Sequence, residues 1–192
     1  PILAFTFVNG LINEKNNVLW ATQDALSELK MAKAASYNFD LELAGSKFDQ
    51  AAKKFMIAQN ELENINVVVS GILQLLPSDT IKSGQILLAI GEDLSKAAQH
   101  LSLGISYVIE NETDRAFTEK IVLMRNEFEL ASPLIKYVMG ELNEVEVDVL
   151  PVENQNDFVQ VRDSLPMVTS IIDKFLSESE AVLKILGHYD KK

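Results

Sequence analysis

The sequence predicts an all-α protein, an elongated antiparallel bundle of about five long helices with heptad-patterned apolar positions. Apolar residues recur at alternating steps of three and four, which is the spacing of one face of a helix. The links between these segments are short, which places consecutive helices side by side in opposite directions. One short stretch alternates with the period of two that a strand requires, but the sequence offers no second strand to pair with it.

The clearest apolar stripe lies in residues 41–76. Its members are Leu41, Ala44, Phe48, Ala51, Phe55, Ala58, Leu62, Ile65, Val69, Ile72 and Leu76. No step breaks the alternation, which predicts coiled-coil-like packing. Asp40 is a suitable N-cap, and Pro77 ends the helix because its ring cannot continue the hydrogen-bond ladder. We expect Phe55 to be buried at the centre of this helix.

The same spacing predicts four more helices and completes the bundle over residues 12–192. The five helices are expected at residues 14–36, 41–76, 80–110, 115–145 and 157–186. The apolar stripe of the fourth starts at Phe117, and that of the fifth includes Val182. The segment Val145–Asn156 is interpreted as an extended crossover. Pro166 is expected to kink the fifth helix or to divide it.

Residues 1–11 stand before the predicted bundle and begin with an apolar run from Pro1 to Val8. This run is far shorter than the roughly 20 residues that span a bilayer. Two interpretations stay open. The segment is either the tail of a membrane anchor or an N-terminal extension that packs onto the bundle.

Composition excludes several classes of function. The 192 residues include 28 acidic and 17 basic ones, for a formal net charge of −11. Such a surface repels phosphate backbones, so we expect no nucleic-acid partner. The chain has no cysteine and only two histidines. Thiol nucleophiles, thiolate metal sites and His-rich metal sites are therefore excluded.

Three glycines lie within the third predicted helix, at Gly84, Gly91 and Gly104. A glycine inside a helix costs about 1 kcal/mol relative to alanine, so it needs a reason. With Ala97 and Ala98, these glycines form a set of small residues, and the favoured reason is close helix packing against Phe48 and Phe55. The alternative is a hinge or a ligand groove.

No catalytic motif occurs in the chain, and its polar candidates have structural interpretations. His100 is interpreted as a polar residue at the flank of an apolar stripe. His188 follows Gly187 at a helix end, where a cation favours the helix dipole. We therefore predict no catalytic, cofactor-binding or metal-binding residue, and no enzyme activity.

Two residue sets suggest ligands, and both are better explained by structure. The acidic set could hold calcium through oxygen ligands but lacks a glycine-containing loop, so a solvated face is favoured. It comprises Glu141, Glu144, Glu146 and Asp148. The aromatic set could line a pocket, but core packing is favoured because no cofactor ligand accompanies it. It comprises Phe48, Phe55, Phe117, Phe128, Phe158 and Phe175.

Three local patterns resemble a known family. The first is Asp40-x-x-x-Ala44-x-x-x-Phe48-x-x-Ala51-x-x-x-Phe55-x-x-Ala58. The second is Leu75-Leu76-Pro77 before the segment Gly84–Leu94, and the third is Leu165-Pro166 before Leu183-x-x-Leu186-Gly187. Over most of residues 12–190 the chain resembles bacterial membrane-anchored surface proteins with the domain of unknown function 4012.

The resemblance implies a topology and a location, and it assigns no functional residues. It implies a membrane helix before this region, helices outside the membrane and a further domain beyond them. The expected location is the bacterial cell surface, anchored to the membrane. The expected partners are other protein domains or a second copy, and the membrane through an N-terminal anchor.

The first functional hypothesis is a non-catalytic extracytoplasmic stalk or interaction module. Five antiparallel helices, an odd number, bring the chain in at one end of the bundle and out at the other. The alternative is a ligand-sensing helical bundle of a membrane receptor, for which an even number of helices and adjacent termini would be expected.

Overall fold

The structure is a computed structural model that describes residues 2–69, 78–109, 115–150 and 152–186. Within these ranges there are five α-helices, one short 3₁₀ helix and no strand, which confirms the all-α class. The elements are α1 (Ile2–Tyr37), α2 (Leu41–Val69), α3 (Ser78–Ile109), α4 (Phe117–Leu142), η2 (Val147–Val149) and α5 (Val152–Ile185).

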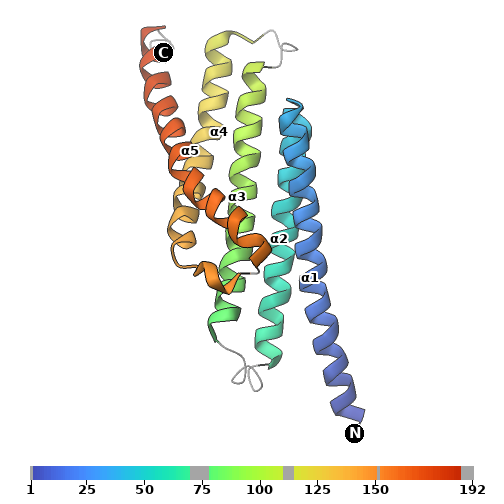
Figure 1. Ribbon diagram of the computed structural model, residues 1–192. Helices are drawn as coiled ribbons and strands as arrows, with labels where there is room; N and C mark the ends of the chain where they lie inside the picture. The colour runs from blue at the N-terminus through green and yellow to red at the C-terminus, as the bar shows by residue number, and fades with distance from the viewer. Residues whose placement is uncertain (1, 70–77, 110–114, 151, 187–192) are drawn as a thin grey trace.

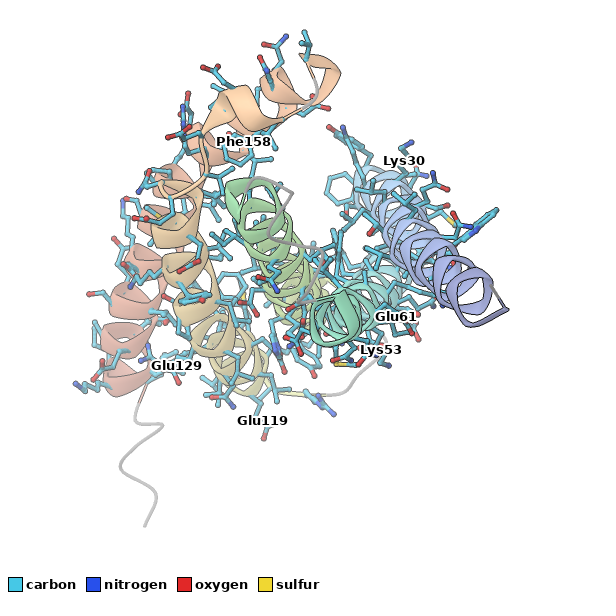
Figure 2. The ribbon with its side chains drawn as sticks, turned by 90° about the horizontal axis from the view of Figure 1, so that it is seen from below. Lys30, Lys53, Glu61, Glu119, Glu129 and Phe158 are labelled. Atoms are coloured by element: carbon cyan, nitrogen blue, oxygen red, sulfur yellow. The ribbon has the colours of Figure 1, made fainter. Side chains whose placement is uncertain are left out.

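The helices form an open row. Helices α1 to α4 pack each on the next in sequence order and alternate in direction, and α5 packs on α4 (Figure 1). Seen along the helix axes, the row is curved, with α1 at one edge and α5 at the other (Figure 2). No extensive contact joins α1 to α5 in the described ranges. The bundle is therefore not a closed ring, and two of its helices have a neighbour on one side only.

Helix α1 starts earlier than predicted. It begins at Ile2 instead of residue 14 and continues without a break through the apolar opening run. Starting signals for helices are local caps, and a helix that continues through an apolar segment displays none. Of the helices described, none combines the length and apolar character needed to cross a membrane.

The predicted extended crossover is wrong. Helix α4 ends at Leu142 instead of residue 145, and α5 begins at Val152 instead of residue 157. The 3₁₀ helix η2 occupies the middle of the link. The alternating apolar residues of this segment belong to a compact turn, in which Val145 is buried against the α3–α4–α5 core. The predicted end of the second helix near Pro77 lies outside the described residues.

Two prolines lie inside helices without dividing them. Pro166 is inside α5, as predicted, and the ribbon of α5 changes direction along its length (Figure 1). Pro133 is inside α4. A proline removes one backbone donor and pushes its ring against the preceding turn, which bends a helix more readily than it ends one when packing holds both halves.

The predicted stripes fit the buried faces in the middle of each helix and fail toward the ends. Phe55 is 5% exposed, as predicted, but Phe117 is 62% exposed and its placement in the core was wrong. In α5 the buried residue is Leu183, not Val182, which is 44% exposed. An α-helix has 3.6 residues per turn, so a strict 3.5-residue stripe drifts by about 20° per heptad away from the core.

Two clusters of buried residues stand out among the described side chains. The smaller one joins α1, α2 and α3 mainly through alanines, at Ala21, Ala25 and Ala58, around Phe55 and Leu88. The larger one joins α3, α4 and α5 through bulkier residues. Its buried members are Ile90, Ala97, Phe128, Ala131, Ile135, Val138, Leu142, Val145, Leu165 and Ile172.

Glycines of α3 lie under phenyl rings on two sides. A Cβ on Gly91 would be 2.8 Å from ring atoms of Phe55 on α2, and one on Gly104 would be 3.0 Å from ring atoms of Phe128 on α4. The predicted close packing is thus confirmed for Gly91 with Phe55. Gly104 is covered by Phe128 of α4, a ring that was not predicted there. A Cβ on Gly84 would meet nothing within 4 Å.

The link between α1 and α2 is tight. Phe39 has φ 58°, in the left-handed region, and the amide of Asp40 donates to the carbonyl of Ala35 at 3.0 Å. The Asp40 carboxylate then accepts from the amide of Leu43 at 3.1 Å, as predicted for an N-cap. The two helices are therefore held antiparallel by a turn with little freedom.

Substitution of the α3 glycines by alanine is predicted to have opposite effects on stability. Gly91→Ala should lower the free energy of unfolding by about 1 kcal/mol, because overpacking against Phe55 outweighs the gain in helix propensity. The control Gly84→Ala should raise it by about 1 kcal/mol, because its Cβ has open space. Urea unfolding measures both. A stabilising Gly91→Ala would contradict the close packing of α2 on α3.

Candidate functional site

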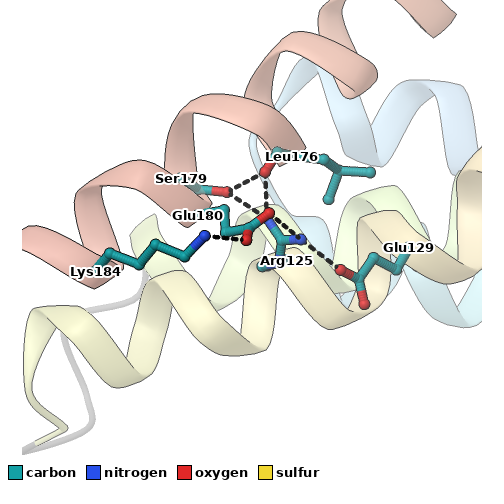
Figure 3. A network of polar contacts seen from close by, with 6 residues as sticks. All are labelled: Arg125, Glu129, Leu176, Ser179, Glu180 and Lys184. Carbon is teal, nitrogen blue, oxygen red and sulfur yellow. Dashed lines mark hydrogen bonds and ion pairs between the residues drawn. The ribbon is translucent and has the colours of Figure 1, made fainter. Parts of the chain in front are cut away.

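The densest polar cluster of the described chain joins α4 to α5 through Arg125 (Figure 3). Its guanidinium donates to the backbone carbonyl of Leu176 and to Ser179 Oγ at 3.2 Å. The same group lies 2.9 Å from the carboxylate of Glu129 and 3.9 Å from that of Glu180. The planar guanidinium of Arg125 therefore contacts one backbone carbonyl, one hydroxyl and two carboxylates.

The cluster follows from the position of Arg125 at the rim of the larger core. Its side chain is only 17% exposed, so its charge needs partners close by. Ser179 is buried and also donates to the Leu176 carbonyl, at 3.3 Å. In the sequence, Ser179 stands in an otherwise apolar stripe, which indicates that a polar side chain of another helix contacts it. The partner itself could not be identified, because it comes from another helix.

Two carboxyl groups have perturbed pKa values of opposite sign. The pKa of Glu180 is lowered, first by its hydrogen bond from Lys184, whose Nζ lies 2.6 Å away, and further by Arg125. The pKa of Asp93 on α3 is raised by burial, with Lys96 opposing the shift and Glu92 adding to it. The ion cluster thus favours the charged form of Glu180, and the α3 environment disfavours that of Asp93.

His100 pairs with a carboxylate across the interface between α3 and α4. His100 Nδ1 lies 2.7 Å from a carboxylate oxygen of Glu127, which connects α3 to α4 at the edge of their contact. This fits the predicted polar flank position. His188 lies outside the described residues.

The acidic candidates do not form one site. Glu141 borders a groove across α2, α3 and α4 with Glu63 and Tyr137, whereas Glu144, Glu146 and Asp148 are exposed in and near the turn before α5. Within the described ranges no group of three His, Cys, Asp or Glu residues could hold a metal ion. The expected absence of metal binding stays a prediction.

The six phenylalanines do not line a common pocket among the described side chains. Phe128 and Phe175 pack edge to face, with ring centroids 5.0 Å apart, inside the larger core. Phe55 belongs to the smaller cluster, and Phe117 faces solvent. Phe158 lies at the start of α5 with the guanidinium of Arg162 5.9 Å from its ring centre. Phe55, Phe128, Phe158 and Phe175 pack in or against the two core clusters, whereas Phe117 does not.

A groove of about 420 Å³ lies where the start of α5 comes nearest to α1. Lys33 of α1 forms one side, and α5 forms the other. Its α5 lining consists of Asp157, Gln160, Val161, Ser164 and Leu165. Lys33 and Asp157 give it one charge of each sign, and Lys33 also lies over the ring of Tyr37 at 5.9 Å. Its lining contains no nucleophile with an activating base.

Comparison with protein-family models, with curated proteins and with solved structures gives no match for this chain. The resemblance to membrane-anchored surface proteins with the domain of unknown function 4012 therefore stays a prediction.

Arg125→Met is predicted to destabilise the protein by about 2 kcal/mol, because the Leu176 carbonyl and Ser179 lose a charged donor. The matched control is Arg162→Met, where the ion partner is the adjacent Asp163 at 3.5 Å. It should change stability by less than about 0.5 kcal/mol. Chemical denaturation of both variants gives the comparison, and equal effects would contradict the role of Arg125 as the link between α4 and α5.

Neutral substitutes for the two perturbed carboxyls should have opposite, pH-dependent effects. Glu180 has a lowered folded-state pKa, so its stabilisation exists above its ordinary pKa and is lost as pH falls through the folded value. Glu180→Gln should therefore lower the unfolding midpoint near neutral pH only. Asp93 has a raised pKa, so ionisation penalises the fold. Asp93→Asn should raise the midpoint near neutral pH and leave it unchanged in acid. Effects independent of pH would exclude both assignments.

Proposed function

We propose that this chain is a non-catalytic helical stalk that holds the segments on its two ends apart. The observation that supports this is the placement of the ends. The first turns of α1 lie at one pole of the bundle and the last turns of α5 lie at the other (Figure 1). Five helices in alternating directions produce this separation, because the four links between them reverse the chain an even number of times.

The dimensions fit a spacer. Helix α1 has 36 residues and α3 has 32, which correspond to about 54 and 48 Å at 1.5 Å per residue. These helices run along the long axis of the molecule (Figure 1). A body of this length equals or exceeds the diameter of a small domain. It separates its two poles without a binding or catalytic site.

Lateral contacts between neighbours support resistance to sliding. Helices α1 and α2 are joined by Lys54 with Asp24 at 3.0 Å and by Lys47 with Glu28 at 2.9 Å. Helices α3 and α4 share the His100–Glu127 contact. The phenyl rings over the α3 glycines interlock as well, so sliding one helix along the next would break packing and ion pairs together.

The proposed setting follows from the family resemblance. The pole at the start of α1 would face the membrane of a bacterial cell through an N-terminal anchor, and the pole at the end of α5 would carry a further domain outside the membrane. Interaction partners would be protein domains at that outer pole or a second copy of the stalk.

One observation favours the alternative, a ligand-sensing bundle. The groove between Lys33 on α1 and Asp157 on α5 lies between the two edge helices, so a ligand there would couple elements that otherwise have little contact. A sensor of this kind would change the distance between α1 and α5 on binding, whereas a stalk keeps it constant.

Spin labels on α1 and near the end of α5 test the stalk, and the cysteine-free chain makes labelling specific. Asn16→Cys with Ala181→Cys should give a distance above about 30 Å, the length of α1 beyond Asn16. The control pair Asn16→Cys with Asn64→Cys should give a much shorter distance, because Asn17 hydrogen-bonds Glu61 at 3.5 Å. Equal distances in the two pairs would refute the stalk and favour the sensor.

A further inference from the structure

Helix α5 carries a second apolar row on the side away from α4. Met167, Ile171, Val182 and Ile185 are 63%, 60%, 44% and 83% exposed. Lys174 and Glu178 lie between them and are 73% and 67% exposed. At about 100° per residue, all six side chains fall within about 80° of the helix circumference. They form one continuous face, defined here as the α5 outer stripe.

The order of residues in the α5 outer stripe is nearly palindromic. Read in either direction it is two apolar residues, two oppositely charged residues and two apolar residues, with its midpoint near residue 176. A second α5 that runs antiparallel about a two-fold axis at this midpoint faces each apolar residue with an apolar one. Met167 then lies opposite Ile185 of the second copy, and Ile171 lies opposite its Val182.

The charges specify the same orientation. In the antiparallel arrangement Lys174 faces Glu178 of the second copy, and the two-fold axis generates this pair twice. In a parallel arrangement with the same register, lysine would face lysine and glutamate would face glutamate. Opposite charges across a helix seam select orientation in this manner, because like charges brought together in a partly buried seam are unfavourable.

The intramolecular alternative for these charges is weak. Lys174 Nζ lies 3.8 Å from Glu178 Oε1 within one helix, and both side chains are mostly exposed. The lysine precedes the glutamate by four residues, which is the less favourable order along a helix. Exchanging this pair for two pairs across a seam therefore loses little.

We propose that the α5 outer stripe is the contact surface for a second copy of this chain, which binds antiparallel about a two-fold axis near residue 176. A two-fold contact is closed, because the same stripe is used on both copies and none is left to recruit a third. The assembly is a dimer with its long axes in opposite directions.

The orientation has a consequence that rests on the proposed stalk. If the start of α1 faces a membrane, the antiparallel dimer points the two membrane poles in opposite directions. Two chains on one flat membrane cannot pair in this way, whereas chains on facing membranes can. The dimer would then join surfaces across a gap.

Sedimentation equilibrium of the full chain tests the dimer. The apparent mass should rise with concentration from 21.4 kDa toward twice that value. Ile171→Lys should weaken association by roughly tenfold or more, as expected for loss of about 1.4 kcal/mol. The control Leu130→Lys, at a residue 53% exposed on α4, should leave association unchanged. A monomer at all concentrations, or equal effects of both substitutions, would overturn the proposal.

Charge exchange tests the register. Lys174→Glu and Glu178→Lys should each weaken the dimer, because each places like charges across the seam. The double variant K174E/E178K should restore association to near the wild-type value. Failure of the double variant to recover, with helical content unchanged by circular dichroism, would overturn the pairing of these two residues.

Disulfide trapping tests the orientation. Chains with Lys174→Cys mixed with chains with Glu178→Cys should form a disulfide-linked pair, and neither variant alone should link efficiently. Linking of each variant with itself would show a parallel arrangement and overturn the proposal. These results do not depend on the pole-to-pole distance, so failure of the stalk and failure of the dimer are distinguishable.

Discussion

Helix α3 packs closely against a phenyl ring on each of its two flanks. Phe55 of α2 lies on Gly91, where a methyl group would force the ring to shift, and Phe128 of α4 lies on Gly104, where a methyl group would be tight. Because α1 packs mainly on α2, and α5 on α4, the two halves of the row are joined through α3. Each of these glycines costs about 1 kcal/mol in helix propensity relative to alanine. Burial of the two phenyl rings offsets this cost.

The two halves of the row differ in how they are stabilised. Alanines such as Ala25 and Ala32 form the α1–α2 seam, which brings the helices close but buries little apolar area per residue. The ion pairs Asp24–Lys54 and Glu28–Lys47 flank this seam and contribute modestly at a partly exposed site. The α3–α4–α5 half has the bulkier core.

The fold class, the antiparallel order and the contact of Phe55 with Gly91 could be predicted from the sequence, because local periodicity and residue size determine them. The early starts of α1 and α5 could not, since neither shows a capping residue. The exposure of Phe117 and Val182 was missed because a 3.5-residue stripe was applied to helices of 3.6 residues per turn. Arg125 was missed for another reason: its partners lie on α5, and no sequence pattern pairs two helices residue by residue.

The edge helices of an open row determine what the molecule can bind, and the two edges differ. Helix α1 exposes Leu19 and Leu26 beside Lys30 and Lys33, which bear the same charge. The two charges on that face have one sign and lie at one end of it, so it lacks the self-complementary charge order of the α5 outer stripe. Helix α5 places its core residues on one side and the self-complementary outer stripe on the other. Together, the core face and the outer stripe make a wide apolar arc on α5, which suits a helix with neighbours on two sides. One chain provides α5 with a single neighbour, α4, and a two-fold partner provides the second.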